Sequence, residues 1–130
     1  MTNSTSMRTA IVIDDDIDTI DVMSELLEIN KIKVVGKGFD GLEAVEMYKK
    51  LKPDIVFLDI MMPNYDGVYA LENIRKINPN AGVIIITGDT TQETMSKLQD
   101  LKPSAIFYKP MEISMVIWAA NNLIAEAIPT

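Results

Sequence analysis

Residues 55–67 read IVFLDIMMPNYDG, and this stretch decides the predicted fold. Four apolar residues, Ile55–Leu58, follow one another without polar alternation, which is typical of a central parallel strand buried on both faces of its sheet. Asp59 ends this strand, and the apolar residues 60–62 come directly after it. An uncompensated charge is costly in such surroundings, so Asp59 is the first candidate for chemistry. Asp66–Gly67 are most economically interpreted as a turn and a helix cap.

Four further apolar runs accompany this strand, and the segments between most of them have helical periodicity. The pattern predicts strands at residues 10–13, 33–35, 55–58, 83–86 and 106–108, and helices at about 17–29, 41–51, 67–77, 91–100 and 112–125. Strands that alternate with helices indicate an α/β fold of (βα)5 type with a parallel sheet. The less apolar strand at 33–35 is expected at a sheet edge, and the strands at 55–58 and 83–86 are expected in the middle.

The length and composition bound the class of protein. A chain of 130 residues with 48% apolar residues suits one compact domain, which we expect at residues 8–126, between a flexible tail at 1–7 and a C-terminal tail at 127–130. The net charge of -7 and the absence of a Lys/Arg run argue against direct binding of nucleic acid. Without cysteine or histidine, disulfides, thiolate metal sites and imidazole catalysis are excluded.

The sequence shows no signal for a membrane. Residues 1–7 lack the basic start and apolar stretch of a signal peptide, and no later apolar run approaches membrane-spanning length. The expected protein is therefore soluble and cytoplasmic, without membrane contact.

Polar side chains follow four of the five predicted strands. They are Asp14, Asp15 and Asp16 after the first strand, Asp59 after the third, Thr87 after the fourth, and Lys109 after the fifth. In an open parallel sheet, ligands bind beyond the carboxyl ends of the strands, so these side chains are expected to converge.

The converging carboxylates predict a metal ion. Asp14, Asp15 and Asp59 would repel one another at neutral pH unless a cation lay between them, and an all-oxygen set with waters favours Mg2+. The metal would bridge Asp15 and Asp59 to the oxygens of a phosphoryl group, and the backbone carbonyl of Met61 would complete the protein ligands.

The same residues are suited to phosphoryl transfer. A carboxylate can attack phosphorus and form an aspartyl phosphate, and the phosphoryl oxygens then need positive charge and hydrogen-bond donors. Lys109 and Thr87 supply these.

Each residue also has a purely structural interpretation. Residues 14–16 would favour a helix N-terminus by their negative charge, and Thr87 would be an ordinary β-branched strand residue or cap. Lys109 by itself would be solvated surface. Only the combination makes the functional interpretation specific.

With these residues together, the chain resembles the receiver domain of two-component response regulators (CheY-like) over roughly residues 8–124. The acidic pair of that family corresponds to Asp14 and Asp15, its phosphoacceptor motif to residues 59–67, its switch hydroxyl to Thr87, and its Lys-Pro pair to Lys109–Pro110. The resemblance implies a flavodoxin-like sheet with strand order 2-1-3-4-5, helices on both faces, and a cis peptide before Pro110 that aims Lys109 at the site.

The resemblance also implies a function. Asp59 would accept a phosphoryl group from a histidine kinase or a histidine phosphotransfer protein, with Mg2+ bound, and water would later remove it. The phosphoryl group would draw Thr87 inward and change the surface of the fourth helix, fifth strand and fifth helix. That surface would control a downstream protein target or a covalently linked output domain. Such a switch is not a conventional enzyme.

Some positions depart from the pattern of the family or vary within it. Ile106 stands where the family usually has Tyr or Phe as an aromatic switch, so an aromatic-coupled output is not expected. Gly88 is a small residue at the entrance for the phosphoryl group, as the family requires. Met61 and Asp89 occupy the two variable positions that are associated with the dephosphorylation rate.

The last predicted helix has a second apolar face. Met115 and Trp118, with Met111 if the helix begins there, lie opposite the stripe that is expected in the core. Such a face indicates a partner surface or a homodimer. The alternative is that Trp118 folds over the helix edge or packs on residues 1–7.

Two other functions fit the fold. One is a protein-interaction module that acts without phosphorylation, against which the intact acidic site argues. The other is a haloacid-dehalogenase-like phosphatase, which would want a second acid two residues after the nucleophile, where Met61 stands.

Overall fold

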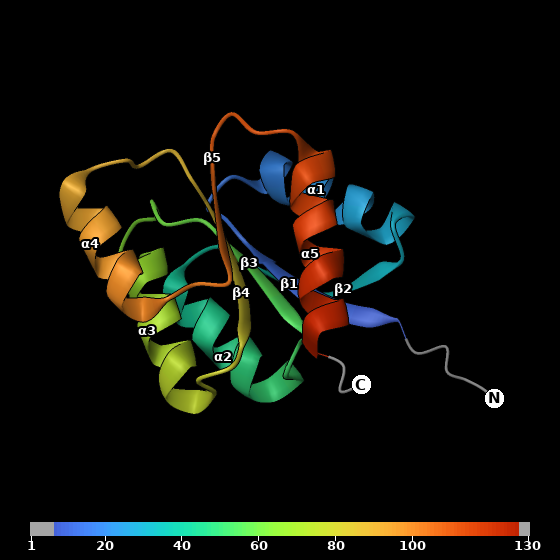
Figure 1. Ribbon diagram of the computed structural model, residues 1–130, viewed down its shortest axis with the longest axis horizontal. Coiled ribbons are helices and arrows are strands. Elements are labelled where there is room, and N and C mark those ends of the chain that lie inside the picture. Colours follow the sequence, from blue (N-terminus) through green and yellow to red (C-terminus); the bar gives the residue numbers. More distant parts are fainter. Residues whose placement is uncertain (1–6, 128–130) are drawn as a thin grey trace.

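Five parallel strands form one sheet in the computed structural model, which describes residues 7–127 and the side chains of residues 7–123 (Figure 1). The strands are β1 (Arg8–Ile13), β2 (Ile32–Gly38), β3 (Ile55–Leu58), β4 (Gly82–Thr87) and β5 (Ala105–Tyr108). Their order across the sheet is β2-β1-β3-β4-β5. The predicted flavodoxin-like (βα)5 fold and its strand order are thus confirmed.

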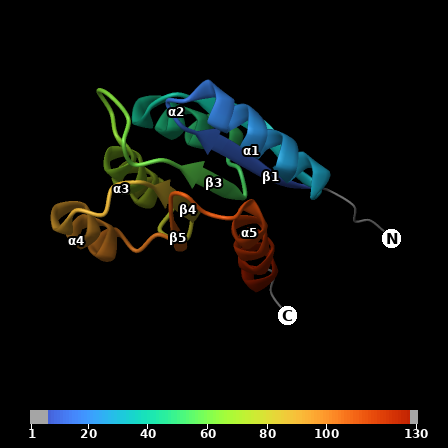
Figure 2. The same ribbon diagram turned by 90° about the horizontal axis from the view of Figure 1, so that it is seen from above.

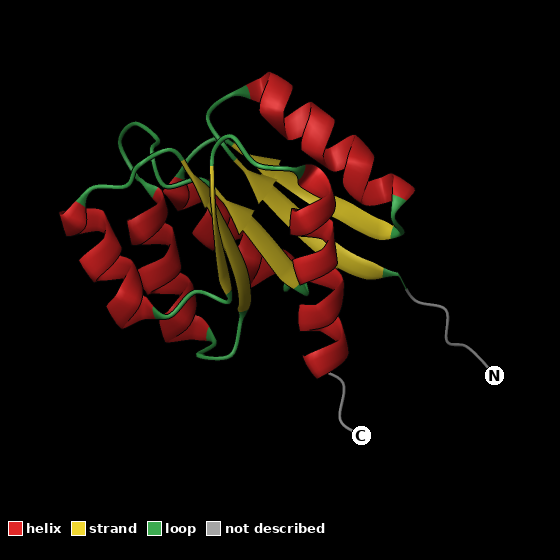
Figure 3. Cartoon of the chain, turned by 45° about the horizontal axis from the view of Figure 1, so that its top comes forward, coloured by secondary structure: helices red, strands yellow, loops and turns green. Residues whose placement is uncertain are grey.

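A helix follows every strand, and the helices cover both faces of the sheet (Figures 2 and 3). They are α1 (Ile17–Ile29), α2 (Gly41–Leu51), α3 (Gly67–Ile77), α4 (Gln92–Leu101) and α5 (Ile113–Ala127). One core layer contains buried residues of α1 and α5, and the other contains buried residues of α2, α3 and α4. Each predicted helix agrees with the structure to within two residues at either end.

The middle of the sheet is buried on both sides. Along β3, Ile55 and Phe57 contact the layer under α1 and α5, whereas Val56 and Leu58 contact the layer under α2, α3 and α4. This explains why the strand has no polar alternation in its sequence.

Strand β2 lies at an edge, as predicted, but it is longer than the predicted residues 33–35. It has a bulge, because Ala10 pairs with Val34 and the next residue of β1, Ile11, pairs with Gly36. Glycine has a low strand propensity, so the sequence does not indicate that the strand continues past residue 35. Packing explains the glycine at position 36, because a Cβ atom there would lie only 3.0 Å from the Sδ atom of Met47 in α2.

Capping side chains begin four of the helices at the carboxyl edge of the sheet. Asp16, Asp40, Asp66 and Thr91 each accept a hydrogen bond from a backbone N–H in the first turn of α1, α2, α3 and α4. The predicted cap Asp66 is therefore confirmed, and the four caps fix the loops that lie at this edge of the sheet.

The expected tails lie almost entirely outside the described residues, namely at 1–6 and 128–130. Because α5 continues to Ala127, it ends one residue beyond the expected domain boundary. In the described part of the chain, no helix has the length and apolar character needed to cross a membrane.

Candidate functional site

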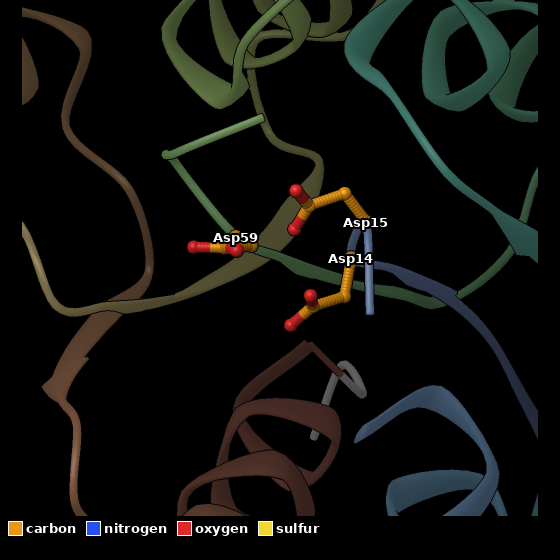
Figure 4. A group of neighbouring side chains, drawn as sticks. All are labelled: Asp14, Asp15 and Asp59. Atoms are coloured by element: carbon orange, nitrogen blue, oxygen red, sulfur yellow. The ribbon is translucent and has the colours of Figure 1, made fainter. Parts of the chain in front are cut away.

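Three carboxylates meet where β1 and β3 end (Figure 4). Asp14, Asp15 and Asp59 each place one carboxylate oxygen so that the three atoms lie within 4.8 Å of one another. The residues are 45 positions apart in sequence at most, yet β1 and β3 are neighbours in the sheet, which brings their ends together. Asp14 and Asp59 are each only 5% exposed, and Asp15 is exposed.

Backbone hydrogen bonds hold the two buried aspartates rigidly. The Asp59 N–H donates to the Ile13 carbonyl at 3.0 Å, and the Asp14 N–H donates to the Gly38 carbonyl at 3.1 Å. These bonds continue the sheet past the ends of its strands. The two buried carboxylates are therefore carried by backbone that is hydrogen-bonded to the sheet, which suits a preorganised site.

Lys109 brings a positive charge to this cluster from the end of β5. Its Nζ atom lies 3.2 Å from Asp14 Oδ2 and 3.6 Å from Asp59 Oδ2. The Lys109–Pro110 peptide bond is cis, as the resemblance implied. The structure thus unites the predicted acidic residues and the predicted lysine.

The electrostatics of the cluster disfavour a third negative charge. Burial raises the pKa of Asp59 to about 6, the nearby Asp14 carboxylate adds to the rise, and Lys109 opposes it. Burial would lower the pKa of the Lys109 ammonium, but Asp59 and Asp14 outweigh burial and raise this pKa above its usual value. Among the described residues, Lys109 is the one cation that pairs with the cluster of three carboxyl groups.

The donor set fits a magnesium ion. All the side-chain ligands that the cluster offers are carboxylate oxygens, which suit a hard cation, and the cluster includes no nitrogen or sulfur ligand. Met61 follows in the same loop, and its N–H donates to Asp59 Oδ1 at 3.3 Å. The contribution of its backbone carbonyl to a metal site stays a prediction.

Thr87 is fully buried at the end of β4. Its hydroxyl oxygen accepts a hydrogen bond from the Asp89 N–H at 2.9 Å, and its carbonyl accepts one from the Lys109 N–H at 2.9 Å. The neighbouring Gly88 borders open space, because a Cβ atom placed on it would meet no atom within 4 Å. A larger side chain at this position would therefore project into open space beside Thr87.

The fifth strand places an aromatic residue close to the site, although not at the usual position. Ile106 is half-buried and packs against the core layer under α4. Tyr108 lies two residues further along and is 45% exposed, and its hydroxyl donates to the Met95 Sδ atom of α4 at 3.3 Å. Sequence reasoning missed this contact, because it compared only position 106.

The exposed face of α5 agrees with the prediction for two of its three residues. Met115 is 53% exposed and Trp118 is 63% exposed, so both side chains are largely open to solvent, as predicted. Met111 is a correction, since α5 begins only at Ile113 and the half-buried Met111 packs against the core layer under α1 and α5. The alternative contact of Trp118 with residues 1–7 falls mostly on residues outside the described part of the chain.

Comparison with known proteins identifies the family. Residues 10–121 match the family model of the response regulator receiver domain. The chemotaxis protein CheY of Thermotoga maritima is 32% identical over 116 residues, which cover 89% of this chain and 97% of that protein.

Solved structures with this fold are also similar. A chain in the crystal structure of the CheX-CheY-BeF3-Mg+2 complex from Borrelia burgdorferi has a TM-score of 0.83 and 26% identity, covering 90% of this chain and 89% of that chain. A response regulator receiver domain protein from Clostridium thermocellum has a TM-score of 0.85 and 26% identity, covering 92% and 96%. The chain therefore belongs to the family of response regulator receiver domains, the CheY-like signalling modules of two-component systems.

Proposed function

We propose that the chain is a phosphorylation switch in which Asp59 accepts a phosphoryl group while Mg2+ is bound beside it. One observation carries the proposal: Asp59 is buried between a second carboxylate and the Lys109 ammonium, at the end of the central strand. Receiver domains bind Mg2+ at an acidic pocket, and the Borrelia relative was crystallised with BeF3 and Mg2+ according to its name. Asp14, Asp15, Asp59 and the carbonyl of Met61 would hold the ion here.

The chemistry follows from the charges of the site. With a pKa of about 6, the Asp59 carboxylate is mostly ionised at pH 7, so that one of its oxygens can attack phosphorus. The new O–P bond forms as the bond from phosphorus to the donor breaks, and the donor keeps that electron pair. Lys109 already lies 3.6 Å from Asp59 and would pair with a phosphoryl oxygen. A bound Mg2+ would neutralise the charge that the transferring group brings.

The donor in this proposal is a histidine kinase or a histidine phosphotransfer protein, and the chain acts in the cytoplasm. Receiver domains interact with kinases and with downstream targets. Phosphorylation would engage Thr87 and alter the surface formed by α4, β5 and α5, which a downstream protein or a linked output domain would read. The chain would thus act by binding and not as a conventional enzyme.

The exposed apolar residues of α5 are the part of this surface that a partner would cover. Met115 and Trp118 stand one helical turn apart and are both largely exposed. If the partner is a second copy of the chain, light scattering will show a dimer with beryllofluoride and Mg2+, and Trp118→Ala will reduce it. A monomer both with and without beryllofluoride would exclude the homodimer.

Intact mass spectrometry after incubation with acetyl phosphate and Mg2+ tests the proposed function. We expect the mass of one phosphoryl group on the wild-type chain, and none with EDTA or in Asp59→Asn. Asp66→Asn is the matched control, because it changes another acidic residue of the same loop and asparagine caps a helix as well as aspartate does.

The opposite result would favour the other function considered. If the chain stays unmodified under conditions that label a known receiver, and beryllofluoride does not bind, a phosphorylation-independent interaction module replaces the switch.

A further inference from the structure

The proposed switch hydroxyl has a hydrogen-bond partner outside the acidic cluster. Thr87 Oγ1 accepts the hydrogen bond from the Asp89 N–H at 2.9 Å. No hydrogen bond in the described part of the chain joins this hydroxyl to the side chain of Asp59 or Lys109. In the structure this hydroxyl is therefore held by the loop after β4 and not by the acidic cluster.

The Asp89 side chain ties the same loop to the start of α4. Its Oδ1 atom accepts a hydrogen bond from the Thr91 N–H at 2.9 Å, and its Oδ2 atom accepts one from the Thr94 hydroxyl at 2.7 Å. These bonds to the charged form lower the pKa of the Asp89 carboxyl below its usual value. Hydrogen bonds to an ionised acceptor are stronger than those between neutral groups.

Few other contacts hold this end of α4. Leu98, in the second half of the helix, is its only described residue that is fully buried. The C-terminal end is bound by Arg75, whose guanidinium donates to the carbonyls of Leu101 and Lys102. In the N-terminal half, the partly buried Met95 packs against the core layer under α4 and accepts a hydrogen bond from Tyr108. The other described side-chain contacts there are the hydrogen bonds around Asp89 and the Thr91 cap.

We propose that Asp89 and Thr94 are positioning residues that hold Thr87 and the first turn of α4 together in the unphosphorylated arrangement. The proposal rests on the proposed function and names its regulation. When Thr87 turns toward a phosphoryl group, the Asp89 amide loses its acceptor, and the loop that carries the Asp89 carboxylate moves with the first turn of α4. The signal thus reaches α4 along the chain and does not require an aromatic residue at position 106.

This arrangement predicts the sign of a mutational effect. A bond that exists only in the resting arrangement lowers the fraction of molecules that are competent to bind a phosphoryl mimic. Removing the bond should therefore tighten binding of the mimic. A bond with a merely structural role would change the thermal stability and leave the affinity unaltered.

The test is isothermal titration calorimetry of the full chain with beryllofluoride in saturating Mg2+. Thr94→Val removes only the hydroxyl that bonds Asp89 and changes no charge. We expect it to bind roughly tenfold more tightly than the wild type, the size expected for losing one hydrogen bond to a charged acceptor. Thr90→Val is the matched control, because Thr90 is exposed in the same loop and should leave the affinity within about twofold.

A second pair of variants separates the geometry from the charge. Asp89→Ala should also tighten binding, and by more than Glu93→Ala, which removes an equal charge from an exposed residue in the first turn of α4. If both acidic variants tighten binding equally, the effect is electrostatic and the positioning role is wrong.

Failure of this inference can be told apart from failure of the function. If the wild type binds beryllofluoride and Thr94→Val binds with equal or lower affinity, Asp89 and Thr94 do not restrain the switch, although Asp59 remains the acceptor. If the wild type neither binds beryllofluoride nor is labelled by acetyl phosphate, the proposed function fails, and this inference fails with it.

Discussion

The centre of the sheet and the corner formed by α4 and β5 are built very differently. Every residue of β3 is buried, and so are four of the six residues of β1 and five of the six residues of β4. In β5 no residue is fully buried, and α4 has one fully buried residue, Leu98. The carboxylates of the site project from the centre of the sheet, and the proposed conformational change occurs in the corner formed by α4 and β5.

This difference assigns separate tasks to the two regions. Phosphoryl transfer needs side chains that keep their geometry, which the continuous core layers around β1 and β3 provide. A switch needs an element whose two arrangements differ by only a few kcal/mol, and an element with little buried surface meets this condition. Thr87 is the last residue of β4 and Lys109 directly follows β5, so they lie where the two regions meet.

The largest expected effect comes from opening a cavity in the centre. Phe57 is 1% exposed, and Phe57→Ala should lower the free energy of unfolding by about 3–5 kcal/mol. Phe39→Ala is the matched control, because Phe39 is exposed and its truncation should cost less than about 1 kcal/mol. Urea denaturation measures both values. If both variants lost the same free energy of unfolding, the centre of the sheet would not be packed more tightly than the exposed surface.

A smaller loss is expected where the corner is joined to the rest of the molecule. Arg75 donates to three backbone carbonyls, those of Ala81, Leu101 and Lys102, at 2.7, 3.2 and 2.9 Å. Arg75→Met leaves these acceptors without this donor and should cost about 2 kcal/mol, with faster amide exchange at residues 92–101. Lys76→Met changes an exposed neighbour and should do neither. Unchanged exchange in α4 would show that Arg75 does not anchor this helix.

Asp59→Asn should stabilise the metal-free protein at pH 7 by about 1–2 kcal/mol, less than the pKa shift alone would give because burying the polar amide of asparagine also costs free energy. The folded pKa of Asp59 is raised from 3.8 to about 6, so the folded protein favours the protonated form. The stability from this group is fully present below pH 3.8 and is lost as the pH rises through about 6. The advantage of the variant should therefore vanish near pH 4 and be complete by pH 7.

Thermal melts in EDTA across this pH range measure the effect. Asp100→Asn, which changes an exposed acid on α4, should show no such pH-dependent gain. A constant difference between Asp59→Asn and the wild type over the whole range would contradict the raised pKa.

The smallest effect is expected at Tyr108. Tyr108→Phe removes the 3.3 Å hydrogen bond to the Met95 sulfur, a weak and exposed contact, and should cost less than about 0.5 kcal/mol. Its consequence should be confined to faster amide exchange in the first half of α4. A loss as large as that of Arg75→Met would mean that β5 holds α4 more firmly than the burial indicates.

The sequence predicted the centre of the sheet well because a strand that is buried on both faces has a continuous run of apolar residues. The run Ile55–Leu58 has one interpretation in a parallel sheet, and a charge such as Asp59 at its end stands out. Asp14, Asp15 and Lys109 could then be placed near Asp59, because the carboxyl ends of parallel strands share one edge of the sheet.

The corner was predicted less completely, since its contacts depend on side-chain geometry that has no period in the sequence. The hydrogen bonds of Asp89 with Thr91 and Thr94 resemble those of many loops that precede helices, so the pattern alone gives no function. Met111 was assigned to an exposed face because the sequence does not show whether α5 begins at residue 111 or 113. The second half of β2 was missed because the close packing of α2 requires glycine at position 36, and glycine gives no sign of a strand in the sequence.

Hydrogen–deuterium exchange with and without acetyl phosphate and Mg2+, in the wild type and in Asp59→Asn, tests most directly the claim that chemistry at Asp59 is read at the corner. The account predicts altered exchange at residues 88–101 and 105–112 of the phosphorylated wild type, little change at residues 8–13 and 55–58, and no change anywhere in Asp59→Asn. Stoichiometric phosphorylation of Asp59 without any change at residues 88–112, or the same changes in Asp59→Asn, would contradict it.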